Sequence, residues 1–527
     1  FTRRNNTNYM QTGVLSSLQL TSMFPNLVLE NFYVKTRNSI ELVRTQAPYA
    51  YVFPAQRDMT RVVRLVNILR AQGIEVGVLP AKVTAGSDTF TAGSYLIKLD
   101  QPYGRLAKNL LEKQDYPDPA LTTYDDSGWS MGHAFDVTVK DVKDKSILDA
   151  KSTLVQTAAF KGNVTGSGNA GLAVAHLGST NMITFRYKLR DVPMNVAEKS
   201  FVSNGVDFPA GSFIVAGGAN VARARALADS LGLTAAALSS LPAVATHDGD
   251  PPRVALYSQL SGTQDLGWYR YAFDQFGIPF DLVYKERIAK GNLQNDYDVI
   301  IMAVQSITRT NVMAQPAARP QPYQRSDQYK FLGMYGETAD MSGGFGPAGV
   351  DAIEKFLDAG GTIIATQAAV RFPIELGYAH TVDVDNVAGI NAQKPLIQAE
   401  ISRTDHPVFY GYANKIFPIK FGGSQVFRVG VADQGNVLAR YVGGESSVLS
   451  GLFVGADSIK QKAFAVDIPN AHNGKGRVLM FANNPIYRWQ NHGEFNMVFN
   501  SILNWNDVPK APVTASGTAR AAGTEGK

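Results

Sequence analysis

One predicted strand ends where several α/β enzyme folds carry their nucleophile. Residues 362–366 read TIIAT, an apolar run that follows a Gly-Gly turn and precedes a second turn. In those folds the residue just past such a strand lies on a tight turn that exposes its side chain. Here this place holds Gln367, Ala368 and Ala369, and none of these side chains is a nucleophile. The sequence therefore predicts a vacant nucleophile position at Gln367 and no catalytic residue.

His492 and Glu494, two residues apart near the end of the chain, are of types that can act as a general base and an acid. Because no nucleophile accompanies His492 and Glu494, we do not expect catalysis there. His492 is instead expected to cap or pack the final helix. Glu494 is expected in the first turn of that helix, where the helix dipole favours a negative charge.

The segment around this pair, NNPIYRWQNHGEF, is the best candidate for binding. Tyr487, Arg488, Trp489 and His492, with Glu494 beside them, combine aromatic faces with hydrogen-bonding groups, the side chains that dominate binding hot spots. The alternative is a packed loop between a strand and a helix. A second polar group, Asp125 and Asp126, could bind a cation or a basic partner, although solvated acids in a loop are commoner.

Composition excludes several classes of protein. The 527 residues include no cysteine, which rules out disulfides, thiolate metal sites and a cysteine nucleophile. The net charge is +5, but no Lys/Arg-rich run is present, so no nucleic-acid partner is expected. No apolar run reaches the ~18 residues of a membrane span. GSGNAG at 166–171 matches a dinucleotide-binding pattern but precedes an expected strand, so no cofactor is predicted.

The elements that would position these residues alternate between strands and helices. Two helices, at 7–24 and 26–45, are separated by Pro25. A strand at 47–54, a helix at 59–73 and a strand at 74–80 follow, a pattern that favours a parallel pair of strands with a right-handed crossover.

A hairpin pattern recurs along the chain. GSDTFTAGSYLIKL starts at Gly86 and GVDFPAGSFIVAG starts at Gly205, which indicates two related modules. Gly93 and Gly211 are expected at positive φ, in turns that need glycine. We read this motif as structural.

The predicted fold class is α/β, multi-domain, with two duplicated α/β modules followed by a doubly wound domain. The expected regions are a helical lead-in at 1–45, modules at 46–145 and 146–250, a larger domain at 251–510 and a low-complexity tail at 511–527. A polar segment at about 308–346 interrupts the last domain. Loops of this length are usually functional or bound to a partner.

Several stretches resemble a known family. APYAYVFPAQRD, LVNILRAQGIEV, FTAGSYLIKLDQPY, LLEKQDYPD and WSMG resemble the C-terminal extension of bacterial zinc carboxypeptidases of the carboxypeptidase A family. GGTIIAT and GRVLMFANNPIYRWQNHGEFNMVFNSIL resemble the class I glutamine amidotransferase-like domain that ends those proteins. The resemblance implies that the zinc catalytic domain is not in this chain, which starts at Phe1 as a processed or partial product would.

The resemblance also implies which catalytic groups to seek. The family's zinc site uses a His-x-x-Glu pair and a distant His, and amidotransferases place a Cys where this chain has Gln367. None of the seven histidines begins His-x-x-Glu, so no metal site is predicted, although histidines far apart in the sequence could still meet in space. They are His133, His176, His247, His380, His406, His472 and His492.

The leading functional prediction is a noncatalytic binding or assembly portion of an exported, periplasmic or extracellular, zinc-carboxypeptidase-like protein. The first alternative is a processed part of an active zinc metallocarboxypeptidase. The second is an accessory protein that binds peptide or carbohydrate. We expect a homo-oligomer or larger assembly, with the polar segment anchored by Tyr323, Tyr329, Phe331 and Tyr335, and a peptide as the candidate ligand.

Overall fold

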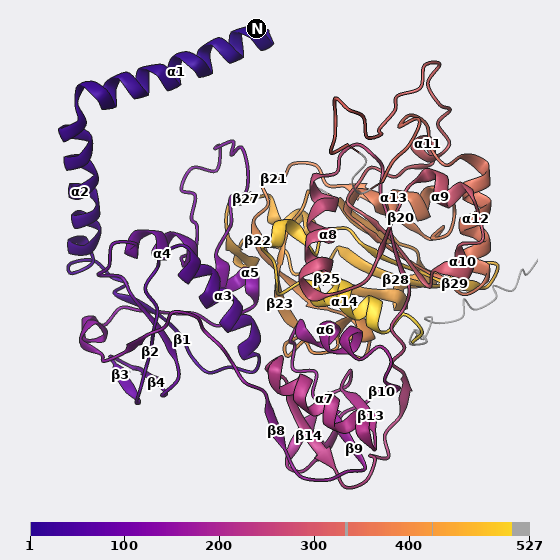
Figure 1. The fold of residues 1–527 in the computed structure, drawn as a ribbon, viewed down its shortest axis with the longest axis horizontal. Helices are drawn as coiled ribbons and strands as arrows, with labels where there is room; N and C mark the ends of the chain where they lie inside the picture. The colour runs from indigo at the N-terminus through magenta and orange to yellow at the C-terminus, as the bar shows by residue number, and fades with distance from the viewer. Residues whose placement is uncertain (1, 333–335, 424, 508–527) are drawn as a thin grey trace, which may run out of the picture. The chain divides into compact units, whose positions relative to one another are not determined.

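The computed structural model describes residues 2–332, 336–423 and 425–507 (Figure 1). The chain forms two compact units. The first unit comprises Phe1–Gln56, Val62–Glu112 and Thr138–Ala159, and the second comprises Arg57–Arg61, Lys113–Val137 and Phe160–Lys527. The five regions expected from the sequence stay a prediction. The predicted tail at 511–527 lies outside the described residues.

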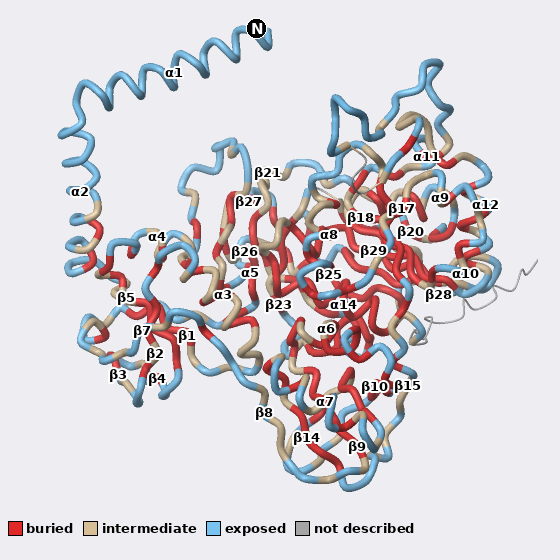
Figure 2. The backbone as a smooth tube through the Cα atoms, viewed as in Figure 1, coloured by how far each residue is buried: buried red, intermediate tan, exposed pale blue. Residues whose placement is uncertain are grey.

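The chain begins with two helices, as predicted. Helix α1 (Arg3–Met23) starts with a capping box between Thr2 and Asn5, and α2 (Pro25–Leu42) starts with Pro25 in its first turn, where the missing N–H of proline costs nothing. Figure 2 shows both helices exposed along most of their length. Among the described helices, none is long and apolar enough to cross a membrane.

The first unit is built on a five-stranded antiparallel sheet in the order β6-β1-β5-β2-β7. Its strands are β6 (Lys140–Val142), β1 (Ala50–Phe53), β5 (Tyr95–Lys98), β2 (Gly77–Val78) and β7 (Thr153–Leu154). Helix α3 (Met59–Ala71) connects β1 to β2 as expected, but these strands are not neighbours. The predicted parallel pair is wrong because β5 lies between them and pairs antiparallel with both.

A second sheet, in the larger unit, repeats this order of pairing and adds one strand. Its order is β15-β10-β13-β9-β14-β8, and β13 lies antiparallel between β9 and β10 as β5 does between β1 and β2. The strands are β8 (Asn163–Thr165), β9 (Gly171–Val174), β10 (Met194–Ala197), β13 (Phe213–Ala216), β14 (Thr234–Leu238) and β15 (Thr246–Asp248). The expected strand after GSGNAG is β9, so no helix opens at this glycine loop.

In both sheets the hairpin that the sequence repeat indicates lies in the chain just before the strand β5 or β13. The hairpins are β3 (Val83–Ala85) with β4 (Asp88–Phe90), and β11 (Phe201–Ser203) with β12 (Val206–Phe208). Gly93 and Gly211 have φ of 84° and 87°, which confirms the predicted positive φ. They lie where the chain leaves the hairpin, and the hairpin tips hold Gly86 and Gly205, also at positive φ. Gly93 donates to the carbonyl of Leu79 at 2.8 Å, and Gly211 to that of Ala197 at 2.7 Å.

The largest sheet contains a parallel part in the order β17-β16-β18-β19-β29. These strands are β16 (Val254–Tyr257), β17 (Asp281–Val283), β18 (Val299–Ala303), β19 (Thr362–Thr366) and β29 (Lys475–Phe481). The chain moves from β16 to β17 on one side and then to β18 on the other, so right-handed crossovers place helices on both faces. Helix α8 (Gln264–Phe276) packs against α14 (Phe495–Leu503) through Phe276 and Phe499, whose ring centroids are 5.0 Å apart.

Antiparallel strands extend the same sheet beyond β29. They are β20 (Val382–Asn386), β22 (Leu396–Ile401), β23 (Ile416–Lys420), β24 (Gln425–Val429), β25 (Val437–Tyr441), β26 (Val448–Ser450) and β28 (Ala463–His472), with β21 (Asn391–Ala392) and β27 (Phe453–Val454) as a separate pair. The remaining helices are α4 (Gly104–Leu111), α5 (Met131–Phe135), α6 (Asn181–Lys188), α7 (Ala219–Ser230), α9 (Lys285–Ala289), α10 (Leu293–Asp296), α11 (Arg309–Val312), α12 (Gly346–Asp358) and α13 (Arg371–Glu375). The coarse α/β prediction is therefore confirmed.

Candidate functional site

The carboxyl ends of β18 and β19 are held in an unusual backbone conformation. Val304 and Gln367, the first residues past these strands, have φ of 54° and 51°. Positive φ is costly for a side chain other than glycine, above all for a β-branched one, and it persists only where surrounding contacts impose it. Here the N–H of Val304 donates to the carbonyl of Thr366 at 3.1 Å, and the Thr366 hydroxyl is hydrogen-bonded to Tyr269.

Gln367 lies on the tight turn that the strand pattern predicts. Its Nε2 donates a long hydrogen bond, 3.4 Å, to the carbonyl of Gly422. A Cβ atom on Gly422 would lie 3.8 Å from the same Nε2, so the amide fills the space beside this glycine. The backbone thus has the positive φ of an exposed-nucleophile turn, but its side chain is an amide that cannot attack a carbonyl.

His492 is fully buried and packed among aromatic rings. Its ring centroid lies 4.4 Å from those of Phe135 and Phe495 and 4.6 Å from that of Trp489. Phe495 is the first residue of α14, so the expectation that His492 packs the final helix is confirmed. Trp489 also meets Tyr271 edge to face at 4.9 Å.

Glu494 is buried at the residue that precedes α14 rather than in its first turn, so its expected place is off by one residue. Its carboxylate accepts from the backbone N–H of Lys420 at 2.7 Å and from the side-chain amides of Asn483 and Asn491 at 2.6 and 2.7 Å. These donors draw the side chain away from the helix N–H groups. Burial nevertheless dominates and raises the pKa of Glu494 to about 8.

Two residues of the predicted binding segment meet the acidic pair. The Tyr487 hydroxyl donates to Asp126 at 2.8 Å, and Nη1 of Arg488 lies 3.0 Å from both carboxylate oxygens of Asp125. The basic partner considered for Asp125 and Asp126 is therefore found within the chain itself. Arg488 has φ of 44°, another costly backbone conformation at this edge of the sheet.

A buried lysine that the sequence did not indicate completes this cluster. Lys420 is 2% exposed, and its Nζ donates to the carbonyl of Gly128 at 2.6 Å and lies 3.4 Å from Asp126. Burial lowers the pKa of Lys420, and Asp126 and Glu494 oppose that change. Its ammonium also lies 5.4 Å from the centre of the Tyr487 ring. We call Asp125, Asp126, Lys420, Tyr487, Arg488 and Glu494 the ionic cluster.

A separate polar pocket of about 300 Å³ lies at the carboxyl ends of β16 and β17. It lies next to the point where the order of parallel strands reverses, which is where open α/β sheets bind ligands. Among the described residues that line it, Lys285 is the one charged side chain. The lining consists of Tyr257, Ser258, Gln259, Leu260, Ser261, Tyr284, Lys285, Asn311, Ala314, Met341, Gly343 and Gly344.

Gln305 fixes the loop that forms one wall of this pocket. Its side-chain oxygen accepts from the N–H of Gln259 at 2.9 Å, and its Nε2 donates to the carbonyls of Gln259 and Ser261 at 3.0 and 2.8 Å. Gln305 follows Val304, so the strained turn after β18 aims this amide at the loop after β16. The wall is therefore preformed.

The polar segment at 308–346 supplies the opposite wall. Asp340 accepts from the N–H groups of Gln321 and Ser342 and from the Ser342 hydroxyl, and these bonds lower the pKa of Asp340 to about 2. Of the four aromatic anchors predicted for a partner, Tyr323 pairs with Thr338 inside the segment. Tyr329 and Phe331 are exposed, and Tyr335 lies outside the described residues.

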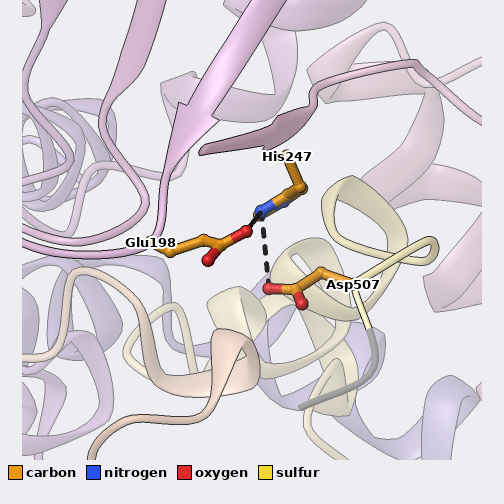
Figure 3. Close-up of side chains that lie close together, drawn as sticks. All are labelled: Glu198, His247 and Asp507. Carbon is orange, nitrogen blue, oxygen red and sulfur yellow. Dashed lines mark ion pairs between the residues drawn. The ribbon is translucent and has the colours of Figure 1, made fainter. Parts of the chain in front are cut away.

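One group of side chains has the composition of a metal site. Glu198, His247 and Asp507 place one ligand atom each within 4.8 Å of one another (Figure 3). No His-x-x-Glu spacing indicates these residues. The fold brings them together from β15, from the residue after β10 and from the residues after α14.

Comparison with known proteins gives distant similarity alone. No protein-family profile matches this sequence, and no curated protein matches it. Similar solved structures include a putative GMP synthase protein from Thermoplasma acidophilum (TM-score 0.27, 9% identity, 49% of this chain and 96% of that chain). A glutamine amido transferase from Methylobacillus flagellatus also matches (TM-score 0.21, 11% identity, 39% and 65%).

A β-galactosidase from Bacillus circulans is a further neighbour, with a TM-score of 0.26 and 12% identity over 48% of this chain. The match spans 31% of that enzyme. Glutamine amidotransferase-like proteins are thus among the structural neighbours, and at these TM-scores the similarity assigns no function.

Proposed function

We propose that this chain is a noncatalytic binding and assembly part of an exported protein of the zinc carboxypeptidase type, and that its polar pocket holds a short peptide with a free carboxylate. The vacant nucleophile position carries the noncatalytic part of this proposal. Gln367 occupies the strained turn, and His492 is packed among rings. A general base must lie within hydrogen-bond reach of the proton it removes, and the burial of His492 among aromatic rings supports a packing role instead.

The pocket supports the choice of ligand. Its volume is at the small end of ligand sites, which fits a ligand of two or three residues. Lys285 lies among hydroxyl and amide groups, and its Nζ donates to the backbone carbonyl of Ser342, so a ligand carboxylate would share this ammonium as its ionic partner. A peptide acid is also the ligand class that the resemblance to zinc carboxypeptidases favours.

Calorimetric titration of the full chain with tripeptides tests this proposal. Tripeptides with a free C-terminal carboxylate should bind at least about tenfold more tightly than the same peptides with a C-terminal amide, because the ionic contact is lost. Lys285→Met should remove this preference, and Lys290→Met, at an exposed residue just past α9, should keep it. Equal binding of acids and amides, or preferential binding of oligosaccharides, would contradict the peptide-acid assignment.

The two N-terminal helices support the assembly part of the proposal. Leu15, Leu18, Leu29 and Phe32 are 57–73% exposed, and large exposed apolar patches usually mark interaction surfaces. We propose that a second copy of the chain covers them. Mass photometry should show a dimer for the natural chain and a monomer for Leu15→Asp with Phe32→Asp, while Val431→Asp, at another exposed apolar residue, should stay dimeric. A monomeric natural chain would contradict the assembly part alone.

A further inference from the structure

We propose that Glu198, His247 and Asp507 form a binding site for a divalent transition-metal ion, with Zn²⁺ as the ion that the donor set fits. Imidazole nitrogen and carboxylate oxygen are both zinc ligands, and three protein ligands with water in the fourth position are a known arrangement around this ion. The site lies in one compact unit and is separate from the pocket and from the ionic cluster.

The distances match a single ion. Nδ1 of His247 lies 3.4 Å from a carboxylate oxygen of Asp507 and 3.6 Å from one of Glu198. A tetrahedral Zn²⁺ with bonds of about 2.0–2.2 Å holds its ligand atoms roughly 3.3–3.6 Å apart. All three ligand atoms lie within 4.8 Å of one another, so little movement is needed to share one ion. Figure 3 shows the imidazole pointing between the two carboxylates.

The tautomer of His247 points to a cation. The amide of Asn504 is oriented by its Nδ2, which donates to the carbonyl of Asn500 at 2.9 Å. Its Oδ1 therefore faces Nε2 of His247, 3.1 Å away, and accepts the proton of that nitrogen. In a neutral imidazole, Nδ1 then carries a lone pair, and this lone pair faces two negative carboxylates. Three acceptors turned toward one point require a positive charge between them.

His247 and its surroundings have the other features of a metal ligand. Its side chain is 11% exposed, and among the described residues its Nδ1 atom is buried without a hydrogen-bond partner. Metal-bound histidines usually donate their second N–H to an oriented acceptor, and Asn504 has that role here. The Glu198 side chain is 37% exposed, which leaves a path for the ion from solvent.

The positive charge of nearby Arg477 is paired with a different carboxylate. The guanidinium of Arg477 binds the carboxylate of Asp467 at 3.0 Å and contacts Asp507 through its backbone carbonyl at 2.9 Å. The side-chain carboxylate of Asp507 therefore remains directed at His247. A bound ion would tie β15 and the residue after β10 to the residues that follow α14.

Calorimetry and metal analysis of the untagged full chain test this site. After dialysis against a chelator, ZnCl₂ should bind with one equivalent per chain. Glu198→Gln and Asp507→Asn, which keep side-chain size and remove one charge each, should weaken binding at least about tenfold, as should Asn504→Leu by releasing His247. Asp358→Asn should change nothing, because Asp358 pairs with His472 and no third ligand group joins this pair among the residues that the structure describes.

Hydrogen exchange supplies a readout that does not depend on affinity. At a Zn²⁺ concentration that saturates the natural chain but not Glu198→Gln, the ion should slow exchange of the backbone amides at 504–507 much more in the natural chain than in this variant, whose fold circular dichroism would verify. The rival explanation is a protonated His247 paired with both carboxylates. Absence of saturable zinc binding to the natural chain, or binding that survives both charge-removing substitutions, would overturn the proposal.

Discussion

The carboxylate of Glu494 accepts the backbone N–H of Lys420 at 2.7 Å, in the interior beneath the loop that follows β29. The side chain of Lys420 extends to Gly128 and Asp126. Lys420 therefore contacts two acids: Glu494, whose pKa is raised, and Asp126, which forms an ion pair with it. These contacts explain how the ionic cluster tolerates burial. The backbone N–H of Lys420 binds the carboxyl group of Glu494, and the backbone carbonyl of Gly128 binds the ammonium of Lys420.

Glu494 should make stability fall as pH rises. Its pKa is raised to about 8, so the folded protein holds this proton more tightly than the unfolded chain does. The resulting stabilisation is complete below about pH 4.3 and is lost as pH rises through about 8. In Glu494→Gln the free energy of unfolding should lack this contribution to its pH dependence. As pH rises from about 4.3 to about 8, the free energy of unfolding of the natural chain should therefore fall relative to that of the variant, by up to about 1.4 kcal/mol per pH unit.

Urea unfolding at pH 5 to 8.5 measures this difference. The glutamine should be accommodated, because Oδ1 of Asn483 has no hydrogen-bond partner among the described residues and could accept from the new amide if Asn483 turns over. Glu445→Gln, at an exposed residue, is the control. A difference between natural chain and Glu494→Gln that does not vary with pH would refute the assignment.

The two aspartates of the cluster should differ sharply in their contribution to stability. The Asp126 side chain is 10% exposed and faces buried Lys420, so Asp126→Asn should cost about 3 kcal/mol or more by leaving that charge without its partner. Asp125 is 49% exposed and pairs with Arg488 near solvent, so Asp125→Asn should cost less than about 1 kcal/mol. Chemical unfolding of both variants at pH 7 decides this, and equal costs would show that Lys420 does not depend on Asp126.

The repeated glycines should also differ. Alanine at Gly93 meets open space and should cost about 1 kcal/mol, through the positive φ alone. A Cβ atom on Gly211 would lie 2.6 Å from Cβ of Tyr410, so Gly211→Ala should cost about 2–4 kcal/mol. Thermal unfolding of the two variants gives the comparison, and an equal effect at both positions would mean that Tyr410 moves aside freely.

The sequence was sufficient for elements whose signal is local. The apolar run at 362–366 is strand β19, and Pro25, which separates the two predicted N-terminal helices, opens α2. The neighbours of a strand are not a local property, which is why β5 was not expected between β1 and β2. The same holds for Lys420, an isolated lysine in an apolar stretch whose partner Asp126 lies almost 300 positions earlier.

The candidate sites also differ in whether their sequence signal is local. Tyr487, Arg488, Trp489, His492 and Glu494 were identifiable because aromatic and polar groups adjoin in one segment. The pocket was not, since its walls come from loops after β16 and β17 and from the segment at 308–346. Glu198, His247 and Asp507 carry no spacing signal at all, and the possibility that scattered histidines meet in space was the one hint that the sequence offered.

The central claim, that the chain binds a peptide acid without cleaving it, is tested most directly by equilibrium dialysis of a tripeptide against the full chain, with mass spectrometry of the peptide in both chambers. We expect an excess of intact tripeptide in the protein chamber, lost in Lys285→Met, and no cleavage products above those in buffer. No excess of peptide, or cleavage products that require the protein, would contradict it.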